Sequence, residues 1–532
     1  MGASLRALRA LVLLAGFYLV GLFLLAVLAG IDWAAALWAP SSLAVKLYVV
    51  SVLLAVPVVR GMFMLRTPKD DGAHGVLVTD AQEPRLWQAV RELAEQVGTR
   101  APDEIRLTAD MNAAVSEDAR FMGLLGGTRR LYLGLPLMTG LTEAQLRAVL
   151  AHEMGHYGNS DTRLSAITVR GRVQVARTIA HFEERAGGKV AKERARQEKK
   201  NEKKLAKGKK ANEVDTTGVG LTYRAMAKVY KAYGHFYLRA TLAGSRRQEL
   251  AADLAAARIA GRDATASALR EIPVLDAAHG FYMSSYATLG VGAGLLPPPG
   301  EVFGGVRHLL AARAGELAEM RRDLPAEPTS PYDSHPPIAE RVARLEALPD
   351  DGRRSEPTGP ALGLLADAHA ALVAVEQATL TPEALGLRRV DWPELVHASM
   401  TAYFMEEAEP LRRATADVTN GDGSLDALLN ALDLGAGWEI ADRLPKSDEA
   451  RAAKGRAARE FARPALRRGL SRLAAGELID RGVARWELSW SEAAALRFPD
   501  GYGEELSAAL DAAVDDRPDT EPLRKLLANT HR

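Results

Sequence analysis

The stretch Ala-His-Glu-Met-Gly-His at residues 151–156 places two histidines four residues apart, with a glutamate directly after the first. Residues four apart on a helix project from the same side, one turn apart. His152 and His156 can therefore bind one zinc ion together, because two imidazoles at this separation suit a single metal. Glu153 points partly around the helix, where it can reach a metal-activated water molecule more easily than the metal itself.

The residues before this motif predict where its helix begins. Thr142 is suited to the N-cap position, and Gln145, three residues later, completes a capping box. Leu146, Val149 and Leu150 then supply an apolar face at helical spacing. The pattern predicts that the motif lies on a capped amphipathic helix.

A second stretch offers a third ligand. Residues 245–253 read Ser-Arg-Arg-Gln-Glu-Leu-Ala-Ala-Asp, and the serine with the glutamine three positions on predicts a helix start at Ser245. Glu249 and Asp253 then share one face of that helix. Catalytic zinc commonly binds two histidines and one glutamate, and a further carboxylate such as Asp253 orients a ligand histidine. By spacing alone, a solvated face paired with Arg246 explains the two acids equally well.

Composition limits the chemistry of any site. The chain has 532 residues and no cysteine, which excludes disulfides, thiol catalysis and cysteine-ligated zinc. Any metal must therefore be held by His, Asp or Glu. The net charge of +1 gives no whole-molecule attraction to nucleic acid, and no nucleic-acid partner is expected. The dense basic run at residues 189–210 predicts a solvated helix or loop, with attraction to anionic lipid as the alternative.

Two apolar segments lie near the N-terminus. Residues 11–31 carry no charge and are long enough to cross a bilayer as a helix. Residues 43–65 contain two basic residues and a proline, but long basic side chains near a helix end can reach the headgroups. We therefore predict an anchor at residues 1–66 with two transmembrane helices. Trp33 and Trp38 are expected in the connection between them, at the membrane interface.

Positive charges predict the orientation of this anchor. Arg6 and Arg9 precede the first segment, and Arg60, Arg66 and Lys69 cluster at the end of the second, whereas the connection has neither Lys nor Arg. The positive-inside rule places the N-terminus and everything after the second segment in the cytoplasm. If only the first segment spans the membrane, the rest of the chain would lie outside, so the second segment decides the compartment. The prediction is a multi-pass protein of the cell membrane with a cytoplasmic catalytic domain. The alternative for the first segment is a cleaved signal peptide.

Three motifs in this order resemble a known family, the HtpX-like and CAAX prenyl protease-type gluzincins, which are membrane zinc metallopeptidases. They are the stretches at residues 151–156 and 245–253 and the later Ser-His-Pro at residues 334–336. The resemblance covers roughly residues 66–348. It implies that Glu249 is the third zinc ligand and that each subunit binds one zinc ion.

The resemblance also implies roles for residues outside the ligand set. Asn112, Ala113 and Ala114 look like the family's strand above the zinc, which receives the substrate backbone. His335, with Arg341 behind it, becomes a candidate donor to the reaction's oxyanion and Arg341 a candidate substrate contact. The alternative for His335 is that the two prolines after it merely start a helix.

The chain departs from the family between its first two motifs. HtpX-like members usually have two further membrane spans there, but residues 157–244 contain none. They contain instead a basic insert at about residues 185–215 and an amphipathic stretch at residues 223–242. The multi-span chamber of the prenyl proteases is also absent, which argues against prenylated substrates.

These patterns predict a mostly α protein with a zincin-like α+β catalytic domain. Alternating residues at 104–107 and 130–133 predict strands of a small sheet. The metallopeptidase domain is expected at residues 67–350, followed by a helical C-terminal domain at residues 351–532 of no recognised role.

The predicted activity is hydrolysis of peptide bonds by a zinc-activated water, with Glu153 as general base. Peptide or protein substrates would add as a strand and must be locally unfolded. Family analogy implies a role in membrane protein quality control. The alternative is a catalytically silent, membrane-anchored scaffold that recruits partners through its helical C-terminal domain. The intact Glu153 favours the enzyme, because a scaffold needs no base.

Overall fold

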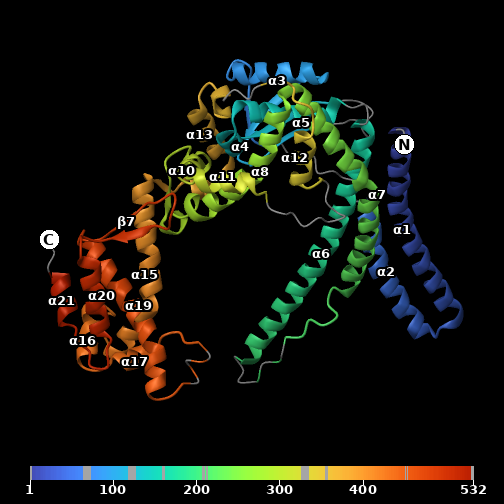
Figure 1. Ribbon diagram of the computed structural model, residues 1–532. Coiled ribbons are helices and arrows are strands. Elements are labelled where there is room, and N and C mark those ends of the chain that lie inside the picture. Colours follow the sequence, from blue (N-terminus) through green and yellow to red (C-terminus); the bar gives the residue numbers. More distant parts are fainter. Residues whose placement is uncertain are drawn as a thin grey trace. The chain divides into compact units, whose positions relative to one another are not determined.

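The computed structural model gives a largely helical chain (Figure 1). It describes residues 3–63, 74–117, 127–158, 162–205, 210, 212, 214–324, 335–353, 358–447, 449, 451 and 453–528. The chain divides into two compact units, and each is described by itself. The first unit is Met1–Pro273 with Met320–Ala366, and the second is Val274–Glu319 with Asp367–Arg532.

Neither unit is continuous along the chain. Residues 274–319, expected in the catalytic domain, pack with the C-terminal part of the chain. The backbone N–H of buried Val302 donates to the carboxylate of buried Glu376 at 2.7 Å, for example. Such a pairing joins residues 74 positions apart, and no local pattern in the sequence announces it.

The anchor region is a helical hairpin of α1 (Ala3–Trp38) and α2 (Ser41–Phe63). The prediction that Trp33 and Trp38 lie in a connecting loop is wrong. Trp33 lies inside α1 and Trp38 is its last residue. The helix continues because nothing in the sequence interrupts it before Pro40, where the missing N–H and the restriction on the preceding residue end it.

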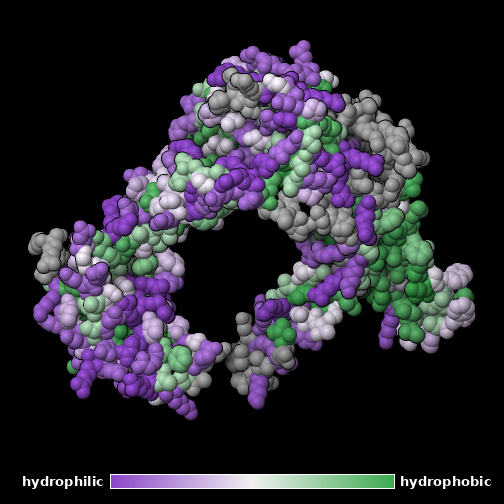
Figure 2. Space-filling view, viewed as in Figure 1, coloured by the Kyte–Doolittle hydropathy of each residue, from purple (hydrophilic) through white to green (hydrophobic). Residues whose placement is uncertain are grey.

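Within the described residues, one helix is long and apolar enough to cross a membrane by length and composition, at Tyr18–Trp38. The second predicted span is represented by a shorter apolar helix, Ser41–Val56. The hydroxyl of Ser51 donates to the carboxylate of Asp32 at 2.7 Å and links the two helices. Apolar side chains gather on the surface over this hairpin (Figure 2).

A four-stranded sheet lies beside the motif helix, in the order β1-β2-β4-β3. Its strands are β1 (Val76–Val78), β2 (Glu104–Thr108), β3 (Ala113–Glu117) and β4 (Arg129–Gly134). The pairing of β2 with β4 is parallel, and the pairings of β1 with β2 and of β3 with β4 are antiparallel. The predicted strands at 104–107 and 130–133 are thus confirmed, and they are the two central strands.

The motif helix is α5 (Glu143–Gly158), which follows α3 (Pro84–Val97) and α4 (Leu135–Gly140). Its predicted capping box is confirmed. The backbone N–H of Gln145 donates to the Thr142 hydroxyl at 3.3 Å, and the backbone N–H of Thr142 donates to the Gln145 side chain at 2.9 Å. The cap fixes the start of α5, and the helix packs against α3, β3 and α7.

Two long helices follow, α6 (Thr162–Leu205) and α7 (Leu221–Ala260). They pack on each other through buried aromatic rings that include Tyr230 and Phe182. The predicted helix start at Ser245 is wrong, because Ser245 lies inside α7. Packing of the aromatic residues before it extends the helix backward, and such tertiary contacts override a local capping signal.

The first unit is completed by α8 (Arg262–Tyr282), which continues into the second unit, and by α12 (Ile338–Glu346). Leu269 of α8 and Leu345 of α12 belong to one buried cluster. Arg341 lies on the buried face of α12 and is 7% exposed.

The second unit is mostly helical, as the Ala- and Leu-rich periodicity of its sequence predicts. Its core is formed by leucines and alanines of α15 (Trp392–Thr419), α16 (Leu425–Asp433), α19 (Arg456–Asp480) and α20 (Tyr502–Ala513). The remaining elements of the chain are η2 (Met283–Ala287), η3 (Val291–Ala293), β5 (Leu295–Leu296), α9 (Glu301–Gly304), α10 (Val306–Ala312), α11 (Ala314–Arg322), η4 (Ala361–Leu364), α13 (Ala368–Thr379), α14 (Pro382–Leu385), β6 (Arg388–Arg389), α15 (Trp392–Thr419), α16 (Leu425–Asp433), α17 (Gly437–Asp442), α19 (Arg456–Asp480), β7 (Arg485–Glu487), β8 (Ala495–Arg497), α20 (Tyr502–Ala513) and α21 (Glu521–Ala528).

Candidate metal centre

Two helices bring three side chains of the predicted ligand set together. His152 and His156 project from α5, and Glu249 reaches them from α7. The His152 Nε2 atom lies 3.5 Å from Glu249 Oε2, and the His156 Nε2 atom lies 3.6 Å from Glu249 Oε1. One donor atom from each residue lies within 4.8 Å of the other two. The predicted convergence of two imidazoles and one carboxylate is therefore present.

The close approach of the two helices depends on a small residue. Gly155 lies between the histidines, and a Cβ atom added there would be 3.4 Å from the Ala252 Cα atom of α7. That distance is at the short limit of ordinary van der Waals contact, so a larger side chain would not fit without a shift of the helices. The glycine in the motif and the alanine on α7 thus allow the imidazoles and the carboxylate to meet.

The donors fit a zinc ion in chemistry and in spacing. Ligand atoms about 2.0–2.1 Å from a tetrahedral ion lie about 3.4 Å from one another. The observed separations of 3.5 and 3.6 Å are close to this value. Glu249 is buried, and its Oε2 atom forms no hydrogen bond within the described part of the chain. A buried carboxylate oxygen in that state is unfavourable, and a cation would compensate it.

Two buried residues, Asp253 and Arg341, form successive contacts that hold His152 on the side of its ring opposite the other ligands. Its Nδ1 atom lies 2.9 Å from Asp253 Oδ1, one turn after Glu249 on α7. Arg341 of α12 donates two hydrogen bonds to the same carboxylate, at 2.8 and 2.6 Å. Burial raises the pKa of Asp253, but Arg341 and His152 outweigh this effect and hold it well below its usual value. A charged carboxylate behind the imidazole orients the ring and increases its basicity as a ligand.

The ionisable groups of the centre influence one another strongly. Burial lowers the pKa of His152, but its contacts with Asp253 and Glu249 raise it overall to about 9. Burial and the neighbouring His152 lower the pKa of His156. Burial raises the pKa of Glu153 to about 7. Perturbed groups that converge in this way are typical of functional sites.

His335 lies at the edge of the centre. Its Nε2 atom is 3.4 Å from Glu249 Oε1, and its side chain is 60% exposed. The two prolines after it directly precede α12, which begins at Ile338. His335 lies both next to the ligand carboxylate and just before a helix. Its position therefore agrees with either hypothesis, an oxyanion donor or the start of a helix. Ser334 lies outside the described residues.

The position of Arg341 differs from the predicted substrate contact. Its side chain is 8% exposed and is bound to Asp253. A buried arginine that is committed to a carboxylate cannot also meet a substrate, so it supports the centre from inside. The sequence pattern did not lead us to predict this ion pair between Arg341 and Asp253. A signal for it exists, since Arg341 follows the helical spacing of the buried Val342 and Leu345 and a buried arginine needs a partner.

The predicted substrate strand lies close to the motif helix. Ala113 and Ala114 begin β3, which is an outer strand of the described sheet and contacts α5. Asn112 precedes the strand, and its carbonyl accepts the backbone N–H of Gly134 at 2.8 Å. This segment is thus held in place by β4 and lies at the side of the sheet next to α5.

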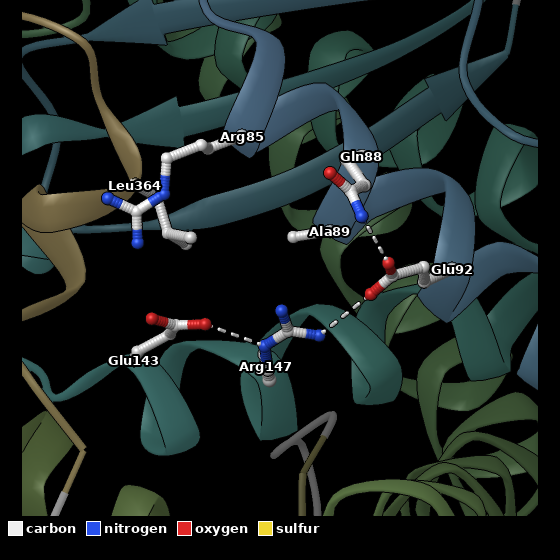
Figure 3. A pocket seen from close by; sticks show the side chains of 7 residues that line it. All are labelled: Arg85, Gln88, Ala89, Glu92, Glu143, Arg147 and Leu364. Carbon is white, nitrogen blue, oxygen red and sulfur yellow. Dashed lines mark hydrogen bonds and ion pairs between the residues drawn. The ribbon is translucent and has the colours of Figure 1, made fainter.

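A separate polar hollow lies near the start of α5 and contains none of the predicted site residues (Figure 3). Arg147 there contacts Glu143 at 3.0 Å and Glu92 at 3.4 Å. These charges neutralise one another, and we assign no function to this hollow.

Comparison with known proteins places the chain among the metallopeptidases. The profile of Peptidase family M48 matches residues 80–348, about half of the chain. The chain belongs to this family and is HtpX-like. It is 24% identical over 300 residues to a Protease HtpX homolog of Paracidovorax citrulli (strain AAC00-1), and 22% identical over 302 residues to one of Acidovorax ebreus (strain TPSY). Each alignment covers 56% of this chain and 80% of the relative. No solved structure gives a significant match.

Proposed function

We propose that the chain is a membrane-anchored, zinc-dependent endopeptidase that binds one zinc ion through His152, His156 and Glu249. The single observation that supports this most strongly is the convergence of these three side chains from two helices. Membership of a peptidase family and the carboxylate behind His152 agree with it. The buried Glu249 Oε2 atom, whose nearest cationic groups among the described residues are His152 at 3.5 Å and Arg341 at 3.9 Å, also agrees with a bound cation.

The roles of the side chains follow from their chemistry. When bound, zinc supplies Lewis-acid chemistry that polarises the scissile carbonyl and acidifies water. Glu153, which follows the first ligand, accepts the proton of the attacking water and later gives it to the leaving amine. His335, exposed beside Glu249, is the proposed donor to the oxyanion. Asp253 and Arg341 hold His152 in its orientation.

The proposed substrate is an extended segment of a peptide or an unfolded protein. It would pair with the segment at Asn112, Ala113 and Ala114, next to the motif helix. Backbone pairing recognises an extended chain and reads side chains weakly. Substrates would therefore be locally unfolded proteins, and removal of damaged membrane proteins is the proposed role.

The proposed location is the cell membrane, with the α1–α2 hairpin as a multi-pass anchor. The apolar surface of the hairpin supports this, although only Tyr18–Trp38 reaches spanning length among the described helices. Lys46 near the start of α2 can extend its long side chain towards the headgroups. Arg6 and Arg9 favour a cytoplasmic N-terminus and a cytoplasmic catalytic domain.

Removal of the metal should abolish the activity. Purified full-length protein is expected to contain one zinc ion per chain and to cleave an unfolded test protein such as reduced casein. Dialysis against a chelator should remove the zinc and reduce cleavage to background, and added zinc should restore both. Metal content would be measured by mass spectrometry and cleavage by the appearance of fragments.

Two results would contradict this proposal in different ways. Cleavage that persists in the metal-free protein would exclude the metal as part of the reaction. Zinc bound through His152 and His156 without any cleavage would favour the scaffold alternative. Variants with alanine at each histidine should lose the zinc and provide the control for its location.

A further inference from the structure

The second half of α6 carries basic side chains on one face. An α-helix turns by 100° per residue, so the six basic residues named next lie within an arc of about 100° around the helix axis. We call them the basic stripe, and its members are Lys189, Lys192, Arg196, Lys199, Lys200 and Lys203. The five of them from Lys192 onward are exposed. The stripe is thus a continuous positive surface and not a scatter of charges around the helix.

Other faces of the same helix are already occupied. The side chain of Gln197 accepts the backbone N–H of Asp215 at 2.8 Å, and that of Asn201 accepts the backbone N–H of Asn212 at 3.0 Å. The chain that returns toward α7 therefore covers a face beside the stripe. The acidic Glu198 pairs with Arg194, which lies outside the stripe.

The charges of the stripe are mostly not neutralised by the protein. Arg196 lies 3.6 Å from a carboxylate oxygen of Glu193, and both are on the surface. No ion pair with a described carboxylate is formed by the four lysines of the stripe that follow Lys189, which are Lys192, Lys199, Lys200 and Lys203. A positive surface of this kind attracts a partner that carries several negative charges.

The fold connects this surface to the apolar hairpin. The first half of α6 packs on α7 through Phe182 and Tyr230, and Tyr18 of α1 packs against the same cluster. Tyr18 lies in the apolar segment at residues 11–31 and begins the described stretch, Tyr18–Trp38, that could cross a membrane. The stripe begins seven residues after Phe182, which is about 10 Å along a helix. The start of the stripe therefore lies close in space to α1, which carries the proposed membrane anchor.

A glycine pair separates the packed half of α6 from the basic half. Ala186 is the last residue of α6 that is buried among those whose burial is described, and Gly187 and Gly188 follow it directly. No atom lies within 4 Å of a Cβ position built at either glycine. Each glycine inside a helix is less favourable than alanine by about 1 kcal/mol, and helices bend at such pairs. The basic half can thus change its angle to the anchor at low cost.

From these observations we propose that the basic stripe of α6 binds the anionic headgroups of the membrane that holds α1. Clusters of four to eight basic residues next to a membrane segment bind acidic lipids electrostatically. The interaction would hold the α6–α7 hairpin, and with it Glu249 of α7, at a fixed distance from the bilayer. The inference rests on the proposed membrane anchoring and does not depend on peptidase activity.

The absence of cysteine makes a direct test possible. A single cysteine at exposed Ala195, beside the stripe, would carry a fluorescent donor on full-length protein in nanodiscs with an acceptor on the lipid headgroups. Energy transfer should be higher with phosphatidylserine than with phosphatidylcholine alone, and should fall as salt is raised. Replacing Lys199, Lys200 and Lys203 by glutamine should reduce the docked-to-undocked ratio about 100-fold, since each contributes about 1 kcal/mol, a factor of about five, near an acidic surface.

A matched control removes the same charge elsewhere. Glutamine at Lys446, Lys454 and Lys525, which lie in the second unit, should leave the energy transfer unchanged. Equal transfer in acidic and neutral nanodiscs would overturn the proposal, as would a response of the label to added RNA but not to acidic lipid. Failure of the protein to enter nanodiscs would overturn the anchoring itself, so the two failures can be told apart.

Discussion

Replacing Glu153 by glutamine is expected to lower the rate of peptide cleavage by a factor of about 10²–10⁴ while leaving zinc bound. Glutamine has nearly the same shape but cannot accept the proton of the attacking water. The three proposed ligands are His152, His156 and Glu249, so the metal content should not change. The measurement is the initial rate of casein cleavage by purified E153Q, together with its zinc content.

A control variant on the same helix makes this result specific. Glu143 lies in the first turn of α5 and pairs with Arg147 at 3.0 Å, away from the ligands. E143Q removes the same charge and should cleave at the rate of the unaltered protein. If E153Q retains that rate as well, Glu153 is not the base, and any remaining cleavage must be traced to another group or to a contaminating peptidase.

Replacing Arg341 by methionine is expected to destabilise the first unit by about 3–5 kcal/mol, because the buried carboxylate of Asp253 loses its charged partner and both of the hydrogen bonds that Arg341 donates. Both side chains are almost fully buried, at 8% and 3% exposure, and they share two hydrogen bonds. His152 would lose part of its support, so zinc affinity should fall by a factor of about 10–100. Hydrogen exchange of α7 and α12 measures the first effect, and competition with a chromophoric chelator measures the second.

Arg344 provides the matched control on the same helix. Its side chain is 59% exposed and pairs with Glu340, so R344M should change stability by less than about 1 kcal/mol and leave zinc affinity unchanged. Removing both buried partners in the variant D253N/R341M should recover part of the lost stability. Wild-type stability and zinc affinity in R341M would show that Arg341 does not position the centre.

The ligand set could be read from the sequence because its determinants are local. Thr142 and Gln145 define the start of α5, and the helical repeat then fixes the relation of His152 to His156. The assignment of Glu249 as a ligand could not be made from spacing alone, because a solvated acidic face explained the spacing equally well. The resemblance to a family selected the ligand interpretation, and the packing of α5 against α7 places the carboxylate at the imidazoles.

Other predictions failed where distant contacts outweigh local signals. Ser245 has the sequence of a helix cap, yet packing of aromatic residues such as Tyr230 continues α7 through it. The packing of residues 274–319 with the C-terminal part of the chain is likewise a distant contact, because it joins segments that are separate in the sequence. Local composition cannot show which surfaces will be buried together.

The amino-acid sequence by itself predicted metal-dependent hydrolysis. The chain has no cysteine, and it carries His152, Glu153 and His156 on one capped helix, a pattern typical of a zinc peptidase. The sequence also determined an apolar N-terminus and a basic run. Only the tertiary structure decided that Arg341 binds the carboxylate of Asp253 and does not contact the substrate. Only the tertiary structure also showed that the basic stripe is carried on a helix packed against α1. The physical reason is that spacing along a helix depends on neighbouring residues, whereas the partner of a buried charge depends on how separate helices pack.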